Sequence, residues 1–206
     1  MEPPMQSAIA ICNVALTTYL GSRTITAFED TSPEAEQCKL HYDRIRLSLL
    51  ERWPWVFASR REKLVEETLN DRAGAWTYRY ARPGHMAAIR WVNDVTAARM
   101  AMQLGQSPDT LRELTADSIY SDVPGAVIEY TRDETDPTVF TSAFADVLAA
   151  HLAAAIAMPI TRDAAKVTGA KREASELLDQ AMVADFNSRP ATEQTFYPMQ
   201  LRVRGY

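Results

Sequence analysis

The apolar residues at the start of the chain recur at the spacing of a helix. Between Gln6 and Leu20 they return every three or four positions, which predicts one buried helical face. This face consists of Ile9, Cys12, Leu16, Tyr19 and Leu20. Gly21 follows directly, and we expect it to cap the helix, because glycine adopts the left-handed conformation of such caps without steric cost.

A second helical stripe is longer and has clear ends. Ser32 followed by Pro33 predicts its start, because the hydroxyl can cap the first turn and proline already holds a helical φ. Apolar residues then recur at helical spacing. They are Cys38, Tyr42, Ile45, Leu49 and Trp53. We expect Pro54 to end this helix, which is about 20 residues and about 30 Å long.

The middle of the chain, residues 74–132, changes to the alternation of strands. Trp76, Tyr78 and Tyr80 alternate with polar residues, the period-two pattern of a half-buried strand. A shorter strand is expected at 87–94. Two or three more are expected within 111–133, where turn residues interrupt the pattern. Residues 97–105 fit either a strand or a helix. We therefore expect a small antiparallel sheet inserted between helical segments.

Helical spacing returns after the strands. Between 140 and 156 an apolar residue stands at every fourth position, and the many alanines would let neighbouring helices approach closely. Asp136 is the expected N-cap of this helix and Pro159 its expected end. Thr161 would then open a last helix.

These elements predict an α+β fold that is mainly α. It would be an antiparallel bundle of about four helices, with an inserted small antiparallel β-sheet and an extended C-terminal tail. The expected boundaries are a helical hairpin at 1–73, a β-rich insert at 74–132, a second hairpin at 133–187 that completes the bundle, and an extended arm at 188–206. The length of 206 residues suits one domain, or one domain with an inserted module.

Composition narrows the class of protein. The formal net charge of −5 argues against a protein whose main role is to grip nucleic acid, because phosphate contacts need a basic face. The start lacks the features of a signal peptide, and Asp146 and His151 make 139–160 a poor membrane span. We expect no membrane partner and a reducing cytoplasm. There Cys12 and Cys38 would stay reduced and buried, the alternatives being a disulfide or a reactive thiol.

The sequence contains no clear pattern of catalytic residues. His41, His85 and His151 are far apart, without a cysteine or carboxylate at metal-ligand spacing. Glycine-rich phosphate loops and the common hydrolase and metalloprotease motifs are absent from the sequence. The acidic run 132–137 could bind a cation, but it lacks the spacing and central glycine of a calcium loop, which favours a polar turn. We expect no enzyme, no cofactor and no metal site.

The segment "LLERWPWVFASRR" (49–61) contains two of the four tryptophans. Beside Arg60 and Arg61 these rings could stack on nucleic-acid bases, yet two arginines make a small electrostatic footprint. The first tryptophan continues the apolar stripe of the preceding helix, which favours burial. We therefore interpret the segment as a structural corner that fixes the bundle against the sheet. The corner consists of Trp53, Pro54, Trp55 and Phe57.

Two long segments carry a resemblance to a known family. They are "AIAICNVALTTYLGSRTITAFEDTSPEAEQC" and "HYDRIRLSLLERWPWVFASRREKL". The matching positions are Asn13, Leu16, Gly21, Ile25, Asp30, Ala35, Tyr42, Arg46, Leu50, Trp55, Phe57 and Ala58. Residues 76–83 and 129–157 continue the match in order, although "PGHM" replaces an acidic residue expected after the proline. In these features the chain resembles the head-to-tail adaptors of short-tailed phages and related prophages, the tail tubular protein A-like family.

This resemblance implies a structural virion protein of the neck. Family members form a homo-oligomeric ring, generally of about twelve copies, between the portal protein and the tail nozzle. Double-stranded DNA passes through the lumen without being read, which suits an acidic chain. Such a protein is made in the host cytoplasm and then resides in the virion. The alternative is a small ligand-binding or DNA-binding accessory domain that uses the aromatic β insert.

The arm at 188–206 is too apolar for a typical disordered end, and no strong helical period includes it. We expect it to order on docking to a neighbouring copy or partner. The alternative is that it folds back onto its own bundle. The candidate interface residues are Phe196, Tyr197, Met199, Leu201, Arg202, Val203, Arg204 and Tyr206.

Overall fold

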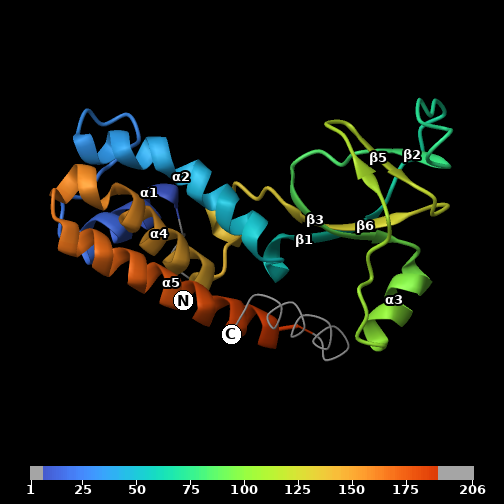
Figure 1. The fold of residues 1–206 in the computed structure, drawn as a ribbon. Coiled ribbons are helices and arrows are strands. Elements are labelled where there is room, and N and C mark those ends of the chain that lie inside the picture. Colours follow the sequence, from blue (N-terminus) through green and yellow to red (C-terminus); the bar gives the residue numbers. More distant parts are fainter. Residues whose placement is uncertain (1–6, 190–206) are drawn as a thin grey trace. The chain divides into compact units, whose positions relative to one another are not determined.

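The computed structural model describes residues 7–189. In that range the chain forms five α-helices and two small antiparallel sheets, and it is 50% helical (Figure 1). The expected α+β class is therefore confirmed, although the strands form two sheets where one was expected. The chain divides into two compact units. The helical unit comprises residues 7–53 and 134–185, and the β unit comprises 54–133 and 186–189.

The first helix, α1 (Ala8–Val14), continues into a π-helical turn (Ala15–Tyr19). The Ser7 hydroxyl caps α1 by accepting the Ala10 amide at 3.0 Å. Of the predicted apolar face, Cys12, Leu16 and Leu20 are buried, whereas Ile9 and Tyr19 are only half-buried. Gly21 follows with a φ of +63°, the left-handed conformation expected of it.

The second helix, α2 (Pro33–Arg52), has the predicted ends. The Ser32 hydroxyl accepts the Ala35 amide at 3.2 Å, and Pro33 occupies the first turn. All five members of the predicted stripe, from Cys38 to Trp53, are buried. Trp53 itself has left the helix, because its backbone is extended immediately before Pro54.

The later helices, α4 (Ser142–Thr161) and α5 (Ala164–Asn187), begin and end differently from the prediction. Asp136 caps only a short 3₁₀ turn (Pro137–Val139), and Thr141 caps α4. Pro159 lies inside the last turn of α4, where its missing N–H interrupts the helix only locally. Thr161 therefore ends α4. Asp163 caps α5, because its carboxylate accepts the Ala165 amide at 2.8 Å.

The core of the helical unit is centred on α4. This helix packs against both α1 and α2. Its buried residues are large at a few positions and small elsewhere, and the small ones let helix backbones lie close together. The buried alanines are Ala145, Ala149, Ala150, Ala153 and Ala157. By length and composition alone α4 could cross a membrane, but a core helix of this kind passes the same test.

The β unit contains two three-stranded antiparallel sheets. The first has the order β1 (Ser59–Lys63), β6 (Val127–Arg132), β3 (Met86–Asn93), and the second the order β2 (Tyr78–Ala81), β5 (Ser118–Ser121), β4 (Glu113–Leu114). Residues from both sheets form one apolar core, which consists of Leu64, Tyr80, Val92, Ile119, Ala126, Ile128 and Tyr130. The helix α3 (Val95–Gln103) lies on the opposite side of the first sheet from β2 and β5 (Figure 1).

Two features of the β unit differ from the predicted insert. It begins at Pro54 and includes β1, which falls in the segment expected to belong to the first helical hairpin. The sequence of β1, SRREK, shows no apolar alternation because β1 is an edge strand with largely exposed side chains. Residues 97–105, which fitted either structure, mostly belong to α3. Asp94 caps this helix by accepting the Thr96 and Ala97 amides.

Candidate functional site

The two tryptophans of the predicted corner belong to different units. Trp53 ends the helical part of the first segment and is 3% exposed. Its indole N–H donates to Asp185 Oδ2 on α5 at 2.8 Å. This bond joins the end of α2 to α5, a connection that the apolar stripe alone did not predict. A buried carboxylate needs such a donor, since an unpaired one would lose its hydration without compensation.

Replacing Trp53 by phenylalanine tests this bond. The ring stays apolar, but Asp185 loses the indole donor, so we expect the free energy of unfolding to fall by about 1–3 kcal/mol. Urea denaturation followed by circular dichroism measures the change. Trp76→Phe is the matched control, because Trp76 is only half-buried and its indole N–H donates to Glu113 Oε2 in a solvent-exposed hydrogen bond. This variant should lower the free energy of unfolding by under about 0.5 kcal/mol. Equal losses in the two variants would contradict the role of Trp53.

Pro54 and Trp55 begin the β unit. Trp55 is completely buried, and its ring centroid lies 6.3 Å from that of Phe57. The buried guanidinium of Arg189 donates to the Pro54 carbonyl oxygen. A 3₁₀ turn (Val56–Ala58) then leads into β1. Because the rings of Trp53 and Trp55 are both buried, they are not available as a platform for stacking nucleic-acid bases.

A buried arginine holds the returning chain in the helical unit. Arg46 on α2 is 4% exposed and donates from Nη1 to the Glu134 carbonyl oxygen at 2.6 Å. Its Nε donates to Asp43 Oδ1 at 3.3 Å. The first residue of the unit's second segment is thereby fixed to the middle of α2, which brings together two points far apart in sequence.

The two cysteines lie together in the helical unit, whereas the three histidines lie at separate places. Cys12 and Cys38 are free and buried, and a hydrogen bond with Cys38 together with burial raises the pKa of Cys12, which disfavours its reactive thiolate. His151 Nδ1 lies 3.0 Å from the Val147 carbonyl oxygen, and burial lowers its pKa. His41 lies on α2, and His85 lies in the turn before β3. Within residues 7–189 no group of three or more His, Cys, Asp or Glu side chains could hold a metal ion.

The strand predicted from the alternating residues Trp76, Tyr78 and Tyr80 is part of a polar network. Arg79 on β2 forms ion pairs with Glu67 and, at 3.2 Å, with Asp71. Tyr120 donates its hydroxyl hydrogen to Asp71 Oδ1 at 2.7 Å. This bond comes first among the causes that hold the pKa of Asp71 below its ordinary value. Tyr80 is buried in the core. Tyr78 packs against the same core, so these two tyrosines of the strand contribute to the packing of the β unit.

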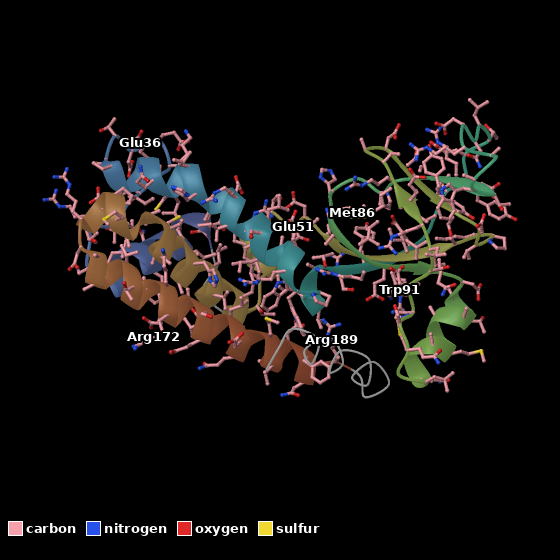
Figure 2. The ribbon with its side chains drawn as sticks, viewed as in Figure 1. Glu36, Glu51, Met86, Trp91, Arg172 and Arg189 are labelled. Atoms are coloured by element: carbon pink, nitrogen blue, oxygen red, sulfur yellow. The ribbon has the colours of Figure 1, made fainter. Side chains whose placement is uncertain are left out.

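A cavity of about 380 Å³ lies elsewhere in the β unit, between the β1-β6-β3 sheet and α3. Arg61 on β1 and Trp91 on β3 are both paired with Glu129 on β6, so the three side chains stand on one face of the sheet. The Arg61 guanidinium lies over the Trp91 ring, 5.2 Å from its centroid. Figure 2 shows Trp91 on the side of the sheet that faces α3. This site was not predicted from the sequence, because no spacing along the chain connects the residues of β1, β3 and α3 that line it.

The candidate interface in the C-terminal arm, from Phe196 to Tyr206, lies outside the described residues and stays a prediction. Comparison with known proteins adds no assignment: neither a protein family nor a curated protein sequence matches the chain.

Proposed function

We propose that this protein is a non-enzymatic adaptor of a phage neck that forms a homo-oligomeric ring between the portal protein and the tail nozzle. In this proposal α1, α2, α4 and α5 form a four-helix bundle that builds the body of the ring, and the β unit is a module inserted between the two helical segments. DNA passes through the lumen, and the net charge of −5 disfavours retention of the duplex.

The observation that carries the proposal concerns the polar positions of the family resemblance. Asn13 on α1 binds the Ile25 backbone twice, because its amide donates to the carbonyl oxygen at 3.0 Å and accepts the amide hydrogen at 2.8 Å. The Asp30 carboxylate accepts the Thr26 and Ala27 amides at 2.7 and 3.2 Å. These bonds hold the pKa of Asp30 below its ordinary value.

The third polar position is Arg46, which holds the Glu134 carbonyl as described. Arg46 and Asn13 fix backbone from other segments to the helices, and Asp30 closes the loop before α2 on itself. A fold depends on residues that bind specific backbone segments. Because these three residues occupy matching positions of the family pattern, they support a fold shared with the family. The buried Trp55, another matching position, supports the same reading.

Co-expression with the portal and nozzle proteins encoded in the same genome tests the proposal. We expect affinity-tagged portal to retain this chain, and electron microscopy of the complex to show a ring of about twelve copies on the portal. The control is tagged portal mixed with the nozzle protein in the absence of this chain. It should retain much less of the nozzle protein. A chain that stays monomeric beside an assembled portal and does not bind it would contradict the proposal.

A further inference from the structure

Helix α3 carries more apolar surface than it buries. Within Val95–Gln103, all of which the structure describes, only Ala98 is buried. Val95 is 41% exposed and Met102 is half-buried, although both line the side of the helix that faces the first sheet. A helix of a folded unit normally buries its apolar stripe. This side of α3 therefore offers apolar surface to a further segment of protein.

The cavity of about 380 Å³ between α3 and the β1-β6-β3 sheet has an apolar floor and a polar rim. The most buried lining residues are Ala98 and Trp91, which are 1% and 3% exposed. Around them stand the exposed side chains of Arg61, Arg99 and Gln103. An apolar centre inside a polar, solvent-accessible rim is the anatomy of a surface on which protein docks.

The charges at the rim do not require a charged occupant. Arg61 donates from Nε and Nη2 to Glu129 Oε2, at 3.0 and 2.5 Å, so these two charges compensate each other. The aliphatic stems of the rim arginines can pack against an apolar segment while their guanidinium groups stay in water. An uncharged, aromatic segment suits this surface.

The described chain ends near the strand that borders the cavity. Arg189 is 5% exposed and donates to the Pro54 carbonyl oxygen, which fixes this end of the chain to the start of the β unit. From Pro54 to Arg61, which lines the cavity from β1, the chain advances seven residues and spans at most about 25 Å. The Arg189 side chain adds a few ångströms to that distance.

The segment that follows Arg189 has the length and the composition to cover the cavity. Residues 190–206 can span about 55 Å, and about ten extended residues suffice to reach the cavity. That distance falls within 196–201, FYPMQL, which contains no charged residue. The arm of the same chain is favoured over that of another copy, because its tether gives it an effective concentration of millimolar order.

We propose that residues 196–201 of the chain's own C-terminal arm pack in the cavity between α3 and the β1-β6-β3 sheet. Phe196 and Tyr197 cover the apolar floor, and the backbone of the arm crosses the polar rim. Residues 202–206 then extend past the cavity and stay available to a partner. This inference concerns the single chain and does not depend on the adaptor function.

Cross-linking in the full chain tests the inference. One cysteine is introduced at the rim by Gln103→Cys and one beside the aromatic pair by Thr195→Cys, and a short bismaleimide joins cysteines that lie close together. The native Cys12 and Cys38 are fully buried and should not react. We expect a link within one chain. It should form at least about tenfold faster than in the control, which pairs Thr195→Cys with Leu40→Cys at an exposed site on α2.

The mass of the product identifies the occupant of the cavity. Links that mainly join two chains would assign the cavity to the arm of another copy and overturn the proposal. Equal rates at the Gln103 and Leu40 positions would overturn it as well. Adding Phe196→Ala with Tyr197→Ala should slow the link at least about tenfold, because these rings are the proposed anchors. An unchanged rate would contradict their docking.

Hydrogen exchange of the full chain gives a second readout that needs no introduced cysteine. Phe196→Ala with Tyr197→Ala should speed exchange of the α3 amides at least about tenfold, since a helix without its cover opens more often. The α2 amides should exchange as in the wild type. Val183→Ala, at an exposed apolar position of α5, is the matched control and should leave α3 unaltered. Unchanged exchange of α3 in the aromatic variant would overturn the proposal.

Discussion

Replacing Trp55 by alanine should lower the free energy of unfolding by about 3–5 kcal/mol, the range for removing a large aromatic side chain from a core. Trp55 is completely buried and is the largest side chain buried to that degree within residues 7–189. Its removal leaves a cavity at the start of the β unit, where the ring also loses its contact with Phe57. Urea denaturation monitored by circular dichroism measures the loss, and a marginal protein could unfold altogether.

Trp76→Ala is the control for this variant, because Trp76 lies in the same unit but is only half-buried. It should cost clearly less than Trp55→Ala. The same two variants also address the stacking alternative for the tryptophan pair. If Trp55→Ala kept wild-type stability and lost affinity for single-stranded DNA in a low-salt binding assay, the structural interpretation of the corner would be wrong.

Deleting residues 190–206 should leave the fold intact and weaken capture by the portal or by neighbouring copies at least about tenfold, the effect of losing a few interface anchors. The deletion retains Arg189, whose bond to the Pro54 carbonyl is part of the described structure. The thermal unfolding midpoint should therefore change little. Co-purification with tagged portal, compared between full-length and truncated chains, measures the loss of assembly.

A second pair of variants separates the apolar and the charged parts of the arm. Phe196→Ala with Tyr197→Ala removes aromatic anchors, whereas Arg202→Gln with Arg204→Gln removes only charge. Loss of assembly in the first pair alone would identify apolar docking, and loss in the second alone an acidic partner. Full assembly of the truncated chain would contradict any role of the arm, and a large fall in its unfolding midpoint would favour the alternative that it folds back.

The helical unit was the more predictable half of the fold. The α2 stripe and its start at Ser32 follow from periodicity and capping chemistry, and both are confirmed. The predictions that Pro159 ends α4 and that Asp136 caps it were wrong for the same reason: each residue affects only the turn in which it lies. Pro159 removes one backbone hydrogen bond near the end of α4 without ending the helix, and aspartate caps a 3₁₀ turn as well as a helix.

The β unit was less predictable because its order depends on partners distant in sequence. The edge strand β1 carries no apolar alternation, so only its pairing with β6 identifies it. The cavity depends on a row in which Arg61 and Trp91 flank Glu129, and strand register is not readable from a single sequence. The bond between Trp53 and Asp185 was missed for the same reason: periodicity predicts burial, but it does not identify a hydrogen-bond partner.

The division of the helical unit into two chain segments affects the order in which the protein can fold. The apolar face of α2 packs against α4, yet the whole of residues 54–133 must be synthesised before α4 exists. At ordinary translation rates that interval is on the order of ten seconds, much longer than the time needed to form a helix. The β unit, whose strands lie within 59–132, can fold in this interval. The folded β unit then shortens the effective loop that must close when α4 emerges. Until that point the α2 stripe from Cys38 to Leu49 lacks the packing that α4 provides.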